Sequence, residues 1–278
     1  MGATLLPALA MSSAVHAQVG LNLDAVVSSA YVWRGVTRVS GWVAQPEGFL
    51  SVKLGGAFLA GGAWASYELK RAGPGDLSDL GTGQSGLAEV NYWGQATWSL
   101  GLVQAALGGI RYTFRGTAPG ARRTRADNTT ELYADLRATS KYIVPGVAVW
   151  LDVDRVRGAY IEGSAAVPLL ANPLAKPFIA LITRAAVGYS LGQEVNTGDP
   201  TQLAYFARAG VTHLDLALSG DVTLHPLRVP TVLRLEGHVQ FSTDDATRPT
   251  SARPSDARRS GKLWAGLALR LSPPIVSW

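Results

Sequence analysis

The sequence predicts a transmembrane antiparallel up-and-down β-barrel of about twelve strands. From position 19 to position 271 the chain repeats segments of roughly ten residues that alternate apolar with polar side chains. Tight turns and long polar loops close these segments in alternation, a rhythm that a soluble sandwich has no reason to show. Strands of about 9 to 11 residues cross the hydrocarbon, and only a closed barrel leaves no backbone group unpaired there.

The composition agrees with a single membrane domain. Only 16% of the 278 residues are charged, and the mean hydropathy is +0.13. No linker rich in proline and serine divides residues 18–278, which we interpret as one domain. The chain has no cysteine, which excludes disulfides, thiolate catalysis and cysteine-ligated metal. It also shows no cluster of metal ligands and no cofactor motif, so neither a metal nor a cofactor is expected.

Residues 1–17 are typical of a secretion signal peptide. Residues 3–11 form a short apolar stretch, and Val15-His16-Ala17 ends on a small residue before Gln18. A positively charged start is missing, because the first basic residue is Arg34. An ordinary N-terminal helix is the alternative interpretation. With a signal peptide, the expected location of the barrel is the bacterial outer membrane.

The first expected strand spans residues 19–33. Its odd-numbered apolar residues, starting with Val19, are expected to face lipid, and Tyr31 and Trp33 are expected in the outer aromatic girdle. Asp24 and Arg34 fall on the opposite face, which is expected to be the lumen.

The remaining strands follow in the same rhythm of short turns and long loops. Gly55-Gly56 is a tight turn between two strands, Gly101 is another, and a loop rich in glycine and aspartate follows the first pair. Asp76 and Asp79 in that loop are assigned to turn chemistry, with a cation site as the alternative. The expected strands are 46–54, 57–69, 87–98, 102–114, 130–139, 147–153, 159–167, 178–190, 203–218, 231–241 and 262–271. Ten or fourteen strands are the alternatives to twelve.

The alternation also predicts which residues line the lumen. Charges of both signs fall on that face, where they form opposing acidic and basic ladders along an open pore or pair across a narrow lumen and plug it. Both interpretations stay open, and Arg137 is expected to pair with an acidic neighbour near the constriction. The expected lining residues are Asp24, Glu68, Glu89, Arg111, Glu131, Tyr133, Asp135, Arg137, Asp152, Glu162, Arg208, Arg234, Glu236 and His238.

Two long loops are basic. Arg122, Arg123 and Arg125 lie in one, and Arg258 and Arg259 lie in the other. These arginines are expected to contact lipopolysaccharide or to draw anions toward the mouth, and the alternative is that they are solvated loop tips. The net charge of +5 does not indicate a nucleic-acid partner, because the basic residues form no dense run with interleaved aromatics.

Three short runs resemble the TorF family of porins. SAYVWRG at 29–35, followed by Gln45-Pro46, resembles the opening motif of that family, and TELYADL at 130–136 and GAYIEG at 158–163 are similar to two of its strands. The resemblance spans most of the mature chain and implies an outer-membrane barrel that conducts solutes, with no catalytic residue. It also implies a last strand recognised by the barrel-assembly machinery. Trp278 supplies the terminal aromatic residue, but Pro273 and Pro274 interrupt the strand before it.

The functional prediction is a porin-like channel for the passive diffusion of small polar or charged solutes, in contact with outer-membrane lipid and lipopolysaccharide. The chain is not expected to be an enzyme. A non-conducting structural or adhesion barrel is the alternative. An outer-membrane hydrolase is disfavoured, because it needs a histidine beside a serine on the outward face and His238 is expected in the lumen.

Overall fold

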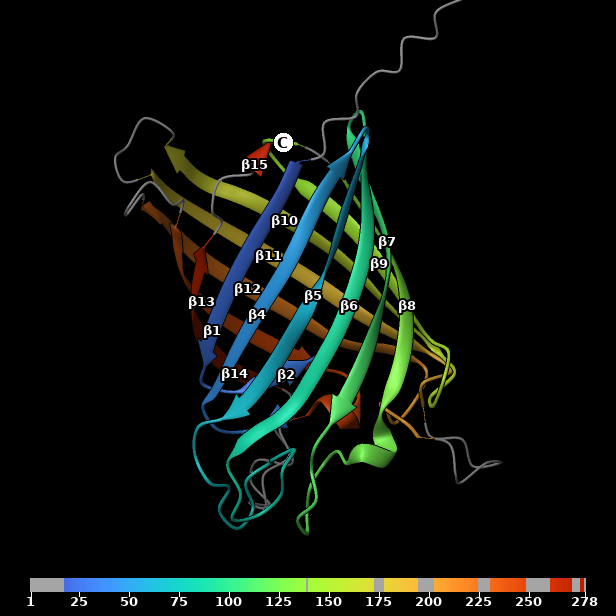
Figure 1. Cartoon of the computed structure of the whole chain (residues 1–278). Coiled ribbons are helices and arrows are strands. Elements are labelled where there is room, and N and C mark those ends of the chain that lie inside the picture. Colours follow the sequence, from blue (N-terminus) through green and yellow to red (C-terminus); the bar gives the residue numbers. More distant parts are fainter. Residues whose placement is uncertain are drawn as a thin grey trace, which may run out of the picture.

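A computed structural model describes residues 18–138, 140–172, 178–194, 203–224, 231–248, 261–271 and 276–277. Within these ranges twelve antiparallel strands form one closed barrel (Figure 1), which confirms the predicted fold class. Closure is made by β1 and β14, which pair from Leu23 opposite Leu271 to Ser28 opposite Gly266. No helix in the described residues is long and apolar enough to cross a membrane.

Each barrel strand pairs with the next one along the chain. The strands are β1 (Gln18–Ser28), β4 (Val43–Leu54), β5 (Ala57–Glu68), β6 (Gly86–Leu100), β7 (Val103–Phe114), β8 (Thr129–Ala138), β9 (Val144–Asp152), β10 (Ala159–Asn172), β11 (Phe178–Leu191), β12 (Gly210–Leu224), β13 (Thr231–Ser242) and β14 (Gly261–Leu271). The short β15 (Val276–Ser277) adds to the start of β1, and the 3-10 helices η1 (Arg125–Asp127) and η3 (Asp245–Thr247) lie in loops.

Tight turns and long loops are segregated to opposite ends of the barrel, as predicted (Figure 1). Gly55 and Gly101 open two of the tight turns with φ of 58° and 65°. Glycine is favoured at these positions because residues with a Cβ rarely adopt positive φ.

Two predicted strands include residues that lie outside the barrel strands by five residues or more. β1 ends at Ser28 instead of continuing to residue 33, and β12 begins at Gly210 instead of residue 203. The placement of Tyr31 and Trp33 in the outer girdle is therefore wrong, because both residues belong to a separate hairpin inside the barrel mouth. Alternation continues through residues 19–33, so it could not show where the chain leaves the wall.

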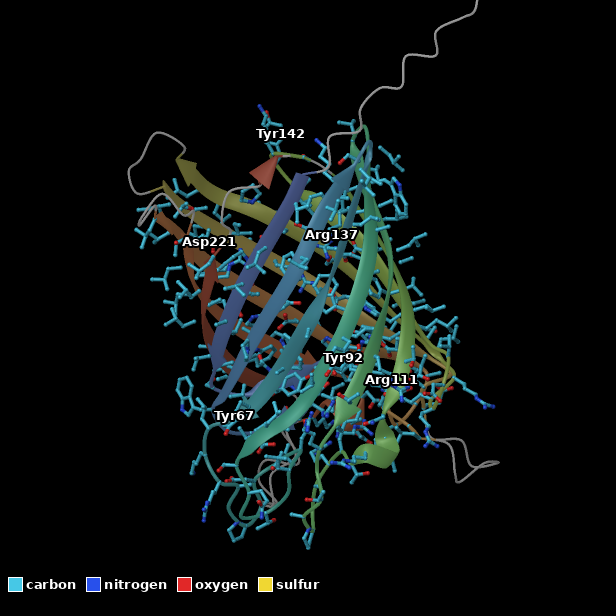
Figure 2. The ribbon with its side chains drawn as sticks, viewed as in Figure 1. Tyr67, Tyr92, Arg111, Arg137, Tyr142 and Asp221 are labelled. Carbon is cyan, nitrogen blue, oxygen red and sulfur yellow. The ribbon has the colours of Figure 1, made fainter. Side chains whose placement is uncertain are left out.

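The outer surface of the barrel carries the apolar side chains. Leu107 in the middle of β7 is 56% exposed, and outward leucines recur on neighbouring strands. Tyr67 and Tyr92 project outward toward the long-loop end, and Tyr142 lies at the opposite end (Figure 2). An apolar band with aromatic residues at both edges is typical of a barrel embedded in lipid.

The alternation predicts opposite effects for a charge on adjacent residues of β7. Leu107→Arg places a guanidinium in lipid near the middle of the strand, which should lower the free energy of unfolding from lipid vesicles by about 2–4 kcal/mol. Ala106→Arg is the matched control, because Ala106 lines a lumen cavity of about 590 Å³. Urea titration should show the larger loss for Leu107→Arg, and equal losses would contradict the assigned faces.

Candidate functional site at the barrel mouth

The segment between β1 and β4 folds as a short hairpin that is not part of the barrel wall and lies inside the barrel mouth. It consists of β2 (Tyr31–Trp33) and β3 (Val36–Val39). Trp33 pairs with Val36, which leaves Arg34 and Gly35 as a two-residue turn. Their φ values are 47° and 80°. Positive φ at both central residues is the signature of a type I′ turn, whose twist matches that of a hairpin. We call residues 31–39 the mouth hairpin.

The mouth hairpin spans the lumen at the long-loop end of the barrel (Figure 1). Arg34 donates hydrogen bonds to Glu131 on β8. The carbonyl oxygen of Gly35 accepts hydrogen bonds from Gln240 on β13, at 2.9 Å, and from Lys262 on β14. β8 and β14 lie on opposite sides of the barrel, with β1 and β4–β7 between them on one side and β9–β13 on the other. The hairpin tip therefore joins opposite walls.

Only glycine fits at position 35. A Cβ atom there would lie 2.5 Å from Nδ1 of His213, far inside van der Waals contact. The positive φ of Gly35 further disfavours any side chain. The RG pair in the sequence thus provides both the turn and the close approach to β12.

The mouth hairpin is buried among aromatic and aliphatic side chains. The ring of Tyr31 lies 5.6 Å from that of Trp64 on β5, and the ring of Trp33 meets Tyr205 edge-on at 4.8 Å. The buried apolar cluster on the other side of the hairpin comprises Val36, Val156, Tyr160, Tyr205 and Phe206. The long-loop end of the barrel is therefore filled by an apolar core.

The ion pair between Arg34 and Glu131 lies at the centre of this core. The two guanidinium nitrogens donate to the two carboxylate oxygens at 2.7 and 2.5 Å, and the side chains are 7% and 0% exposed. Tyr112 donates a third hydrogen bond to Glu131. Burial acts to lower the pKa of Arg34, but the charge and hydrogen bonds of Glu131 together with the nearby Tyr112 and Tyr160 outweigh it, so the net shift is upward and Arg34 stays charged.

A second buried ion pair holds the outer strand of the hairpin. Arg38 on β3 donates to both carboxylate oxygens of Asp79, at 3.0 and 2.8 Å, and lies 3.7 Å from Glu89 on β6. Asp79 is positioned by Glu68, which accepts hydrogen bonds from the Asp79 amide and the Ser78 hydroxyl. The interpretation of Asp79 as a turn residue was therefore incomplete, because its carboxylate fixes the hairpin to the loop between β5 and β6.

The charges deeper in the lumen pair with neighbours along the wall. Each described pair joins residues on one strand or on neighbouring strands. Arg137 contacts Asp135 at 2.8 Å on its own strand, as expected for a pairing with an acidic neighbour. The cross-strand pairs are Arg270 with Asp24, Arg184 with Glu162, and Arg234 with Asp221. His238 contacts Asp215 and Glu236 and stacks on Trp264.

Two cavities remain inside the barrel on the short-turn side of the hairpin tip. One of about 260 Å³ is lined by the mouth hairpin, including Arg34, and by wall residues mainly of β10–β14, including Glu162 and His238. The other, of about 590 Å³, is lined largely by β4–β9 residues, including Tyr133, Asp135 and Arg137. Figure 2 shows Arg137 directed into the barrel. The lumen is thus largely filled at its mouth and retains space below, with charged and apolar side chains along its lining.

Two of the predicted lining residues do not face the lumen. Arg111 points outward beside Tyr92 and pairs with Asp154 at 2.6 Å (Figure 2). Its strand neighbour Tyr112 takes the inward position, because the face that includes Ala106 is the lumenal one. Arg208 lies exposed in the loop before β12 and donates to the carbonyl oxygen of Thr243. The error for Arg208 follows from starting that strand too early.

Two other predicted lining residues support loops. Glu68 holds the loop between β5 and β6, and Asp152 accepts hydrogen bonds from the Thr129 hydroxyl and from the amides of Asp154 and Val156. Both carboxylates are almost fully buried. They stabilise the loops at the ends of their strands and do not line the open part of the lumen.

Only the first of the two basic loops lies wholly within the described residues. Arg122 and Arg125 are exposed, and the guanidinium of Arg123 lies 4.7 Å from the ring centroid of Tyr205. Arg258 and Arg259 lie outside the described residues, as do residues 1–17, Pro273, Pro274 and Trp278.

Sequence reasoning missed the mouth hairpin and the role of Arg38. The available signal was the run YVW-RG-VTRV, in which a two-residue turn separates two short segments rich in β-branched and aromatic residues. The porin-like motif at 29–35 covers part of the same run but does not indicate that these residues fold inward.

No family model and no curated protein matches the chain. Solved structures with similar folds include the translocator domain of autotransporter NalP from Neisseria meningitidis, at 12% identity and TM-score 0.39 over 95% of this chain and 90% of that one. They also include Acinetobacter baumannii OccAB2, at 6% identity and TM-score 0.39 over 92% and 97%. A Pseudomonas aeruginosa FadL homologue is 10% identical, with a TM-score of 0.38 over 92% of this chain and 89% of that one. These low scores support no functional inference, and the barrel assignment rests on the strand pairing described above.

Removing the carboxylate charge of Glu131 should destabilise the barrel strongly. In Glu131→Gln the buried guanidinium of Arg34 loses its counter-charge, which should lower the free energy of unfolding by about 3–5 kcal/mol. Asp135→Asn on the same strand is the control, because its partner Arg137 is 61% exposed and can be hydrated. Urea unfolding in vesicles measures both, and similar losses would refute the central role of the Arg34–Glu131 pair.

Proposed function

We propose that this protein is an outer-membrane channel for the passive diffusion of small polar or charged solutes, and that the mouth hairpin limits its conductance. The cavity of about 590 Å³ below the hairpin, whose mixed lining includes Asp135, Arg137 and Arg270, is the observation that carries the proposal. Charged side chains inside a barrel require water or partners, and the 61% exposed Arg137 indicates a hydrated lumen. The resemblance to the TorF porins supports the same assignment, and we include membership of that family in the proposal.

The outer-membrane location and lipid partners belong to the same proposal. The exposed leucines and the tyrosines at both barrel edges support insertion in a bilayer. The exposed guanidinium groups of Arg122 and Arg125 support contact with anionic lipopolysaccharide or steering of anions. Assembly through the last strand remains part of the proposal as well.

A non-conducting structural barrel is the second candidate, and the filled mouth favours it. The apolar cluster and two buried ion pairs pack around the hairpin, and among the described residues they restrict the space beside it to separate pockets of about 260 and 360 Å³. A hydrolase gains less support, because His238 contacts two carboxylates and the indole of Trp264 but no serine within the described chain.

Removing the hairpin should separate these two candidates. Ser28 pairs with Val43 across the base of the segment, so a short Gly/Ser turn replacing residues 30–41 leaves the wall intact. In planar bilayers, this variant should conduct several times more current per channel than the full chain. The double variant Arg34→Ala/Arg38→Ala should raise conductance in the same direction. Arg115→Ala/Arg125→Ala is the control, since both side chains are exposed.

The conductance of the full chain, compared with that of the variant without the hairpin, shows whether the native protein is a channel. Small but discrete conductance steps in the full chain, enlarged by hairpin removal, would support a restricted channel. Conductance seen only after hairpin removal would assign the native chain to the structural class. No conductance in either form would refute a conducting lumen.

Neutralising Arg137 should shift ion selectivity toward cations. In Arg137→Gln the carboxylate of Asp135 loses its partner and adds one negative charge to the lumen wall. Asp135→Asn is the matched opposite change and should shift selectivity toward anions. The reversal potential under a salt gradient measures both, and parallel shifts in the two variants would contradict a lumenal role for this pair.

A further inference from the structure

A separate pocket of about 360 Å³ lies on the loop side of the mouth hairpin. Four parts of the chain converge on it. They are β3 with Arg38, the loop between β7 and β8 with Arg122 and Arg123, the loop between β11 and β12 with Tyr205 and Phe206, and η3 with Ala246. The pocket is distinct from the lumen cavities, because the hairpin separates them. Its volume is in the range of sites that hold small organic molecules.

The cationic groups of this pocket are not all balanced. Arg38 is neutralised by Asp79 and Glu89. The guanidinium groups of Arg122 and Arg123 make no ion pair with any residue in the described ranges. Partial desolvation in the pocket and repulsion from Arg38 lower the pKa of Arg122, whose side chain stays partly exposed, and of Arg123, and the more distant Asp79 carboxylate offsets only part of each shift. The pocket therefore holds positive charge that an anion would stabilise.

The pocket combines this charge with apolar walls. Val36, Tyr205 and Phe206 supply aliphatic and aromatic surface, while Arg122 and Arg123 supply hydrogen-bond donors. A fully hydrated inorganic anion would gain little from the apolar walls, and a neutral apolar molecule would gain nothing from the guanidinium groups. A molecule with a carboxylate at one end and an apolar body at the other uses both.

The backbone that carries these groups is fixed. The amide of Arg122 donates to the carbonyl oxygen of Ser78 at 3.0 Å. On the opposite side, the amides of Ala207 and Arg208 donate to the Asp244 carboxylate at 3.1 Å each. Such anchoring lowers the entropy that a ligand must remove on binding, which favours a formed site over solvated loop tips.

We propose that the pocket between Arg122, Arg123 and Tyr205 is a binding site for small organic carboxylates that arrive from the loop side of the barrel. This site goes beyond the proposed channel function, because it binds its ligand whether or not the lumen conducts. It also gives the basic loop a defined role that general electrostatic steering does not.

The test uses the full chain refolded in detergent and isothermal titration calorimetry with three probes. Benzoate carries both recognition features, benzamide has the same shape without the charge, and inorganic phosphate has charge without an apolar body. Benzoate should bind at least about tenfold more tightly than either of the other two, because a charge-assisted hydrogen bond contributes about that factor. Arg122→Gln/Arg123→Gln should remove that preference.

Two further variants keep the result interpretable. Arg125→Gln removes an exposed arginine of the same loop that does not line the pocket, and it should leave benzoate binding unchanged. Arg122→Lys/Arg123→Lys retains the charge and should restore part of the affinity. Equal binding of benzoate and phosphate would reduce the site to a counter-ion site and overturn the proposal. Equal benzoate binding by the chain and by Arg122→Gln/Arg123→Gln would also overturn it. Conductance of the same samples tests the channel separately.

Discussion

The occlusion of the barrel depends on the ion pair between Arg34 and Glu131. Arg34 adopts positive φ, a conformation that costs a non-glycine residue about 1–3 kcal/mol and persists only when its surroundings enforce it. The two carboxylate oxygens of Glu131 and the rings of Trp33, Trp150 and Tyr160 enforce it by fixing the guanidinium on several sides. Because Glu131 belongs to β8, a one-residue slip in strand register would turn its carboxylate toward lipid. The hairpin can therefore take its position only when the strands of the barrel are in the correct register.

The ion pairs and the apolar contacts of the hairpin have different energetic roles. Deleting one partner leaves the other charge buried without a counter-charge, which is costly. Release of the whole hairpin would instead hydrate both charges. The ion pair therefore contributes much less to holding the hairpin in place than a single substitution would suggest. Apolar burial is different, because Tyr31, Trp33 and Val36 would become exposed on release at about 25 cal/mol for each Å². The apolar cluster thus stabilises the closed mouth, and the ion pairs set the position at which it closes.

The sequence predicted the wall of the barrel well and its mouth poorly. Strand alternation depends on which side chains face lipid, a requirement that every strand meets separately, so strands such as β7 and β13 were recognisable from local pattern. Arg111 was misplaced because the alternation along its strand was assigned to the wrong face, and Arg208 because the strand was started too early. A charged residue near a strand end can face outward at the membrane edge. The run YVW-RG-VTRV could have indicated a hairpin, but its position inside the barrel could not be inferred, because that position depends on contacts between Arg34 and a strand that begins about a hundred residues later.

The two sides of the mouth hairpin differ in how their charges are balanced. On the short-turn side the acidic and basic groups pair along the wall, as Asp24 does with Arg270, so their fields decay as those of local dipoles. On the loop side, Arg122 and Arg123 have no acidic partner within the described chain, and their field extends into the medium. In the proposed channel, an anion approaching from that side would meet these arginines and the apolar cluster before it reached the paired charges of the lumen. Discrimination among solutes would therefore take place at the mouth, before the paired charges of the lumen act on any solute that enters.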